Sequence, residues 1–96
     1  MKIELQFLQD PYEPYEHENL AFSFWKRDIK TDTDKKKIVS MIHHLYHMCC
    51  VESGMDVKDL DEILANTTYA KVGFTIGINL ESSNYSLYTY NANKKN

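Results

Sequence analysis

The sequence predicts an α+β domain in which a mainly antiparallel four-stranded sheet carries one long and one short helix on one face. Two stretches near each end of the chain alternate apolar and polar residues, as expected for strands with one buried face. Between them, apolar residues recur at steps of three and four, which is typical of helices. The predicted order along the chain is therefore strand, strand, helix, helix, strand, strand.

The composition is that of a small folded domain. The chain has 96 residues, of which 43% are apolar and 26% are charged. A chain of this size buries roughly 60 to 65% of its unfolded surface, enough for one modest core. We therefore expect a single domain over residues 1–96, with 91–96 as a flexible tail.

Two strands are predicted near the N-terminus, over 2–8 and 20–27, with a loop between them that contains Pro11 and Pro14. In both strands, every second residue is apolar. The apolar positions are Ile3, Leu5, Phe7, Leu20, Phe22 and Phe24.

A long helix is predicted over 34–53 and a short one over 57–65. Thr33 or Asp34 is the expected cap of the long helix, Ser53-Gly54 its expected end, and Asp56 the expected cap of the short helix. The apolar stripe of the long helix comprises Ile38, Met41, Ile42, Leu45, Met48 and Cys49. The inner face of the short helix comprises Val57, Leu60, Ile63 and Leu64.

The strongest strand pattern runs from Ala70 to Leu80, and a return strand is expected over 85–91. Gly73 and Gly77 fall on the polar side of the first of these strands. Glycine inside a strand indicates a bulge, a bend or the close approach of another backbone.

The chain shows no signal for export or for a membrane. No apolar run approaches the ~18 to 20 residues that span a bilayer, and Met1 to Asp10 lacks the apolar block of a signal peptide. We therefore expect a cytoplasmic protein in which the adjacent Cys49 and Cys50 are thiols, since neighbours on one helix point about 100° apart.

Three histidines and both cysteines crowd into His43 to Cys50. On a continuous helix, His43, His47 and Cys50 lie within about 60° of one another. Imidazole and thiolate are the ligands that zinc prefers. The spacing therefore predicts three zinc ligands, whereas His44 points elsewhere and is expected to be exposed or at an interface.

His17 is the best candidate for a fourth zinc ligand, because it is the remaining histidine and lies in the long loop, and Glu16, Glu18 or Cys49 are the alternatives. The site is expected to be structural, since a catalytic zinc needs an open position and a nearby carboxylate, and the segment from His43 to His47 holds no carboxylate. The alternative without a metal is a surface histidine cluster in which cysteine packs as a small apolar residue.

Acidic residues form two clusters, although the net charge is only −3. This charge argues against direct nucleic-acid binding, which normally uses a basic surface. The clusters instead suggest docking onto the basic channel of a nucleic-acid-processing enzyme, in competition with phosphates. The predicted partner-binding residues are Glu13, Glu16, Glu18, Asp56, Asp59, Asp61 and Glu62.

No catalytic constellation is recognisable, so we expect a binding protein rather than an enzyme. In length, acidic character and its His43, His47, Cys50 cluster, the chain resembles the small anti-CRISPR inhibitors that phages direct against type II effector nucleases, some of which contain zinc. The resemblance implies binding to an RNA-guided nuclease and blocking of guide or target DNA loading in the cytoplasm of an infected cell.

Three alternatives remain open at the level of sequence. One is an antitoxin or immunity protein that masks a toxin, and another is a zinc-dependent hydrolase. The third is a homo-oligomeric structural protein that associates through the edge of the last hairpin. Aromatic residues suited to interfaces are Tyr12, Tyr15, Trp25, Tyr85, Tyr88 and Tyr90.

Overall fold

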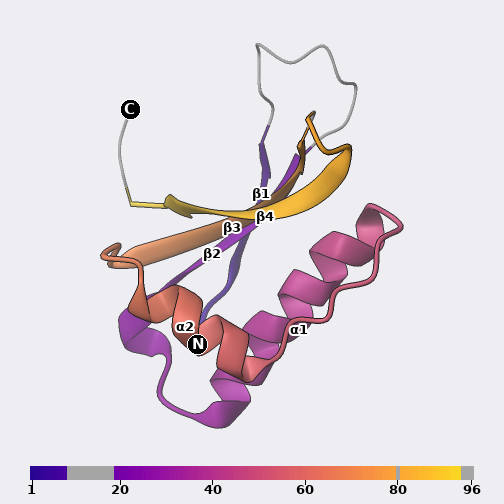
Figure 1. Cartoon of the computed structure of the whole chain (residues 1–96). Coiled ribbons are helices and arrows are strands. Elements are labelled where there is room, and N and C mark those ends of the chain that lie inside the picture. Colours follow the sequence, from indigo (N-terminus) through magenta and orange to yellow (C-terminus); the bar gives the residue numbers. More distant parts are fainter. Residues whose placement is uncertain (9–18, 80, 94–96) are drawn as a thin grey trace.

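A four-stranded antiparallel sheet with two α-helices on one side forms the protein (Figure 1). The computed structural model describes residues 1–8, 19–79 and 81–93. Its elements are β1 (Glu4–Leu8), β2 (Asn19–Trp25), the 3-10 turn η1 (Lys26–Asp28), α1 (Asp32–Met48), α2 (Val57–Ala65), β3 (Lys71–Asn79) and β4 (Asn84–Asn91). The predicted α+β class and the order of elements are confirmed.

The strands lie in the sheet in the order in which they follow one another in the chain, β1-β2-β3-β4, and each neighbouring pair is antiparallel. In the central pair, Phe22 lies opposite Phe74 and Phe24 lies opposite Val72. Because opposite residues share a face, this register gathers the large apolar side chains of β2 and β3 under the helices.

The core lies between the helices and the two central strands. The three phenylalanine rings at its centre have centroids 5.6 to 6.3 Å apart. Such rings supply large buried areas in a small domain. The buried apolar residues of this core are Phe22, Phe24, Ile38, Ile42, Leu45, Leu60, Val72, Phe74 and Ile76.

Helix α2 has the predicted bounds and the predicted cap. The Asp56 carboxylate accepts from the Asp59 N–H, and the Asp59 carboxylate accepts from the Asp56 N–H, each at 3.0 Å. This capping box satisfies donors that the first turn leaves free. A second fastening lies at the other end of α2, where the Lys26 ammonium donates to the carbonyls of Leu64 and Thr67.

Helix α1 begins two residues before the predicted start. Thr31, not Thr33 or Asp34, is the cap: its hydroxyl accepts from the Asp34 N–H, and the Asp34 carboxylate accepts from the N–H groups of Thr31 and Lys30. Asp34 therefore occupies the third helical position of a capping box. The Lys30 N–H bond lowers the pKa of the Asp34 carboxyl.

Helix α1 also ends at Met48, five residues before the predicted end. Cys50 has a left-handed backbone with φ of 57°, and the N–H groups of Cys50 and Val51 donate to the carbonyls of His47 and Tyr46. These two bonds form a Schellman motif, which stops a helix. The sequence reading assigned this role to Gly54, because glycine is the usual residue at such a position.

The early end of α1 exposes part of its predicted apolar stripe. Ile38, Ile42 and Leu45 are buried as expected, whereas Met48 is 52% exposed.

The predicted tail begins inside β4, which ends at Asn91, and residues 94–96 lie outside the described residues. Over the described ranges, neither helix is long and apolar enough to cross a membrane.

Candidate functional site

The proposed zinc ligands do not share one helical face. His43 and His47 are both exposed on α1, but Cys50 follows the helix in the Schellman turn. The assumption of a continuous helix through Cys50 is therefore wrong, and the regular angle between the three side chains is lost.

His43 already has another partner. Its Nε2 atom lies 2.7 Å from the carbonyl oxygen of Met55 in the segment that joins α1 to α2. A neutral imidazole with its proton on Nε2 donates to this carbonyl and thereby holds the connection against α1. The structure thus gives His43 a role in joining the two helices.

No group of three or more His, Cys, Asp or Glu side chains within residues 1–8, 19–79 and 81–93 is placed to hold a metal ion. The predicted fourth ligand, His17, lies outside the described residues. The described donors do not fit a tetrahedral site, so zinc stays a prediction, which elemental analysis of protein purified without added metal tests.

The two cysteines are free thiols in different surroundings. Cys50 is exposed, whereas Cys49 packs partly against the core. Burial, and to a lesser degree the neighbouring Cys50, raises the pKa of the Cys49 thiol. An activated nucleophile needs the opposite shift, so this environment favours packing over chemistry for Cys49.

Three of the four acidic residues predicted on α2 have partners within the chain. Asp56 and Asp59 cap the helix, and the bond from the Asp59 N–H lowers the pKa of the Asp56 carboxyl. Asp61 forms an ion pair with Lys35 at 2.9 Å, which joins α2 to α1. Glu62 is exposed. A role of these residues in partner binding stays a prediction.

The other predicted acidic cluster cannot be placed, because Glu13, Glu16 and Glu18 lie outside the described residues.

The sheet face opposite the helices carries an aromatic ring close to two cations. The guanidinium of Arg27 lies 4.6 Å from the centre of the Trp25 ring, and the ammonium of Lys71 lies 5.5 Å from it. Cations at these distances over an aromatic face are attracted to its electrons. Trp25 is partly exposed, so this cluster is available at the surface.

Lys71 connects this cluster to the first strand. Its ammonium contacts the Glu4 carboxylate in an ion pair. The hydrogen bond from Lys71, reinforced by its charge, lowers the pKa of the Glu4 carboxyl. The ion pair spans β2 and thereby links β1 to β3 on the helix-free face.

Two tyrosines of β4 lie over the two glycines of β3 on this same face. A Cβ atom added at Gly73 would collide with the Tyr90 ring, and one added at Gly77 would lie 3.1 Å from Cε2 of Tyr88. The predicted close approach at these glycines is thus real, but aromatic side chains make it. Tyr88 remains 46% exposed.

Two hydroxyl groups on this face are buried, those of Ser23 and Tyr90. Ser23, Gly73 and Tyr90 occupy one row across the sheet, and Ser23 is fully buried. Neither the Ser23 hydroxyl nor the Tyr90 hydroxyl has a hydrogen-bond partner among the residues described. Burial raises the pKa of the Tyr90 phenol.

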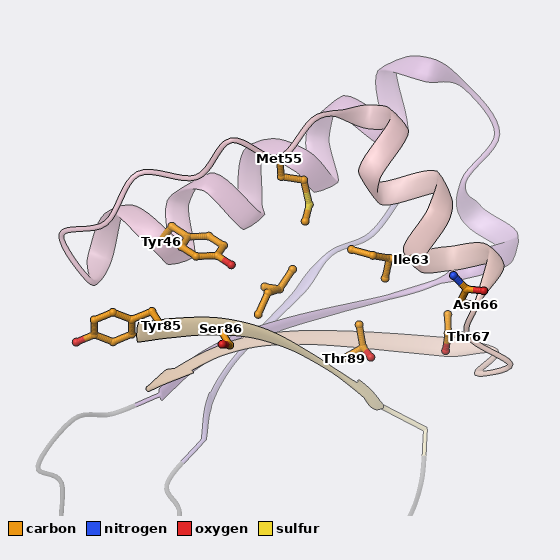
Figure 2. Close-up of a pocket in the computed structure, with 9 residues that line it drawn as sticks. Tyr46, Met55, Ile63, Asn66, Thr67, Tyr85, Ser86 and Thr89 are labelled. Atoms are coloured by element: carbon orange, nitrogen blue, oxygen red, sulfur yellow. The ribbon is translucent and has the colours of Figure 1, made fainter. Parts of the chain in front are cut away.

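On the helix side, a cleft of about 560 Å³ separates β4 from the helical layer (Figure 2). Tyr46 and Met55 bound it on one side, and Tyr85 and Thr89 of β4 bound it on the other. The remaining lining residues are Ile63, Asn66, Thr67, Ser86 and Leu87. None of the lining side chains is charged, so the cleft favours uncharged groups.

Sequence reasoning identified Trp25 and Tyr88 as suitable interface residues but missed Arg27 and Lys71. Lys71 stands on the polar side of the β3 alternation, as does Trp25 in β2. Only the register, which places Trp25 opposite Lys71, shows that the two side chains meet.

A scan against protein-family models finds no matching family, and comparisons with curated proteins and with solved structures find no match.

Proposed function

We propose that this protein is a small protein-binding inhibitor that acts by covering a surface of its partner with the helix-free face of its sheet. The observation that carries the proposal is the ring of Trp25, which contacts the cations of Arg27 and Lys71 on a face that also presents the exposed Tyr88. Trp, Tyr and Arg are the residue types that contribute most binding free energy at protein interfaces.

These side chains are suited to binding because their own sheet already restrains them. The two cations restrain Trp25, and Tyr88 packs against the backbone at Gly77. Ordering a flexible side chain at an interface costs about 0.5 to 1.5 kcal/mol. Restrained aromatic groups avoid part of this cost, which favours a rigid contact face.

The partner we propose is an RNA-guided type II CRISPR nuclease, whose loading with guide RNA or target DNA the bound protein blocks. The support is the resemblance of the chain to small phage anti-CRISPR inhibitors, together with its net charge of −3.

The test is a binding measurement against a type II nuclease, with and without guide RNA, coupled to a DNA-cleavage assay. Arg27→Ala and Tyr88→Ala remove exposed side chains of the helix-free face and are expected to weaken binding about tenfold or more each. Lys58→Ala, at an exposed base on α2, is the matched control for Arg27 and should leave binding unchanged.

Circular dichroism and a melting curve check that each variant is folded. Absence of binding to the nuclease in both states would remove this partner from the proposal. Binding that is equal for the wild type and for both face variants would show that another surface makes the contact.

A further inference from the structure

Strand β4 lies at an edge of the sheet, and one hydrogen bond shows which of its residues bond to β3 and which point outward. The Ala92 N–H donates to the Lys71 carbonyl at 2.9 Å, and these two residues extend by one pair the register in which Val72 lies opposite Asn91. In an antiparallel ladder, hydrogen-bonded pairs alternate with pairs that are not bonded to each other. The backbone groups of Tyr85, Leu87 and Thr89 therefore point away from β3, toward the open edge.

This edge lacks the features that prevent strands from pairing with other chains. Natural edge strands are protected by charged side chains, proline, bulges or short length. The eight residues Asn84–Asn91 contain no charged residue, no proline and no glycine. The opposite edge strand, β1, has five residues and begins with the charged Glu4.

The same three residues of β4 also line the cleft on the helix side. A strand added beside β4 would hydrogen-bond to Tyr85, Leu87 and Thr89, and the side chains of its residues opposite these three would lie on the cleft side. The free backbone groups and the uncharged cleft thus form one continuous surface.

We infer that this surface binds β4 of a second copy of the chain, antiparallel, with Leu87 opposite Leu87. Symmetric pairing about this residue places Tyr85 of each copy opposite Thr89 of the other. Tyr85, Leu87 and Thr89 then each meet another of these outward-pointing residues, and each such pair exchanges two backbone hydrogen bonds.

The side chains are complementary in this register. On the cleft side, Leu87 meets Leu87 and the large Tyr85 meets the small Thr89. On the helix-free side, the small Ser86 lies opposite Tyr88 of the second copy. Within the chain, β4 already pairs large with small where Tyr88 lies over Gly77. Since β4 has no charged residue, the pairing brings no like charges together in spite of the net charge of −3.

This inference concerns the edge of β4 and does not depend on the partner proposed above. Sedimentation velocity of the whole chain over a roughly hundredfold range of concentration tests it by mass action. We expect the mass of two chains at the highest concentrations and dissociation toward one on dilution. A single-chain mass throughout the range would overturn the inference.

Thr89→Pro and Thr89→Lys separate pairing at β4 from association elsewhere. Thr89 is exposed and its N–H points outward, so proline removes a donor that β3 does not use. We expect each variant to weaken dimerisation about tenfold or more. Thr68→Lys adds the same charge at an exposed site between α2 and β3, and it should dimerise as the wild type does. Wild-type dimerisation by both Thr89 variants would overturn the inference.

Residue-resolved amide exchange gives a readout that does not require a variant. The amides of Leu87 and Thr89 should become protected as the concentration rises, whereas those of Tyr88 and Tyr90, already bonded to β3, should be protected throughout. Protection of Leu87 and Thr89 that does not change with concentration would contradict pairing at this edge.

Discussion

The two faces of the sheet are buried in different ways. On the face under the helices, Phe22, Phe24 and Phe74 pack against apolar side chains of α1 and α2. On the helix-free face, the strands cover one another: Tyr90 lies across Gly73, and Lys71 contacts Glu4 across β2.

On the helix-covered face, burial depends on large side chains that fill the space below the helices. On the helix-free face, it depends on a residue small enough to let a neighbouring ring lie against the sheet. A helical layer fills the space above large side chains, so Phe22 and Phe74 are buried because they are large and apolar. Where no helix is present, a tyrosine can lie flat on the sheet only if the residue beneath it has no Cβ atom. Gly73 provides that space.

The most destabilising of these substitutions removes a side chain from the helix-covered face. Phe74→Ala removes a fully buried ring that contacts both Phe22 and Phe24. We expect the free energy of unfolding to fall by about 3 to 5 kcal/mol, because the lost burial is compounded by the cavity that remains. Urea denaturation measures it. A loss below about 1 kcal/mol would contradict the central position of Phe74.

The next substitution adds one methyl group to the helix-free face. Gly73→Ala is expected to cost about 2 kcal/mol, because the new Cβ forces the Tyr90 ring from its place. Gly77→Ala is the matched control: its Cβ would lie 3.1 Å from the half-exposed Tyr88 ring, so a slight shift of that ring accommodates it and the loss should be much smaller.

A double-mutant cycle with Tyr90→Ala identifies the cause. If the collision is responsible, Gly73→Ala should cost much less in the Tyr90→Ala background. Equal costs in both backgrounds would assign the effect to the backbone of Gly73 instead.

A smaller effect acts where the sheet meets the helical layer. Lys26→Met keeps most of the length of the side chain and removes the ammonium, which donates to the carbonyl of Leu64 in the last turn of α2 and to that of Thr67 beyond the helix. We expect a loss of about 1.5 kcal/mol in unfolding free energy, the lower end of the range for a hydrogen bond to a charged group, because the Lys26 bond is only partly buried. The exposed Lys30→Met should change stability little, and a similar loss for both would contradict the cap.

The smallest effect is the pH dependence of the ion pair on the helix-free face. Lys71 lowers the pKa of Glu4 below its ordinary 4.5, so the pair stabilises the fold above that value. The contribution is lost as the pH falls through the lower pKa of the folded state. Glu4→Gln should therefore reduce stability at neutral pH and weaken its loss in acid, as measured by melting temperature against pH. An unchanged acid dependence would contradict the contribution of Glu4.

The helix-covered face was predictable because it depends on local periodicity. The alternation in β2 and β3 identified Phe22, Phe24, Val72 and Phe74 as the buried positions, and the cap at Asp56 located α2. These features involve residues within a few positions of one another, and their physical causes are the alternation of strand side chains and the free N–H groups of a helix start.

The zinc hypothesis depended on a helix end that local reasoning misplaced. Gly54 is the usual kind of residue for a helix stop, yet Cys50 adopts the left-handed conformation. In this conformation the N–H groups of Cys50 and Val51 donate to carbonyls in the last turn of α1. Because α1 ends at Met48, Cys50 lies outside the helix and no longer shares a helical face with His43 and His47.

The α+β class, the order of the elements, the position of α2 and the apolar positions of each central strand follow from local patterns in the sequence. The contacts of the remaining positions in these strands follow only from the assembled sheet. Lys71 meets Glu4 and Trp25, and Tyr90 meets Gly73, because the register across four strands places them together. Alternation assigns each residue to a face of the sheet but does not say which residue of a neighbouring strand lies opposite it, so contacts such as that of Lys71 with Glu4 follow only from the register.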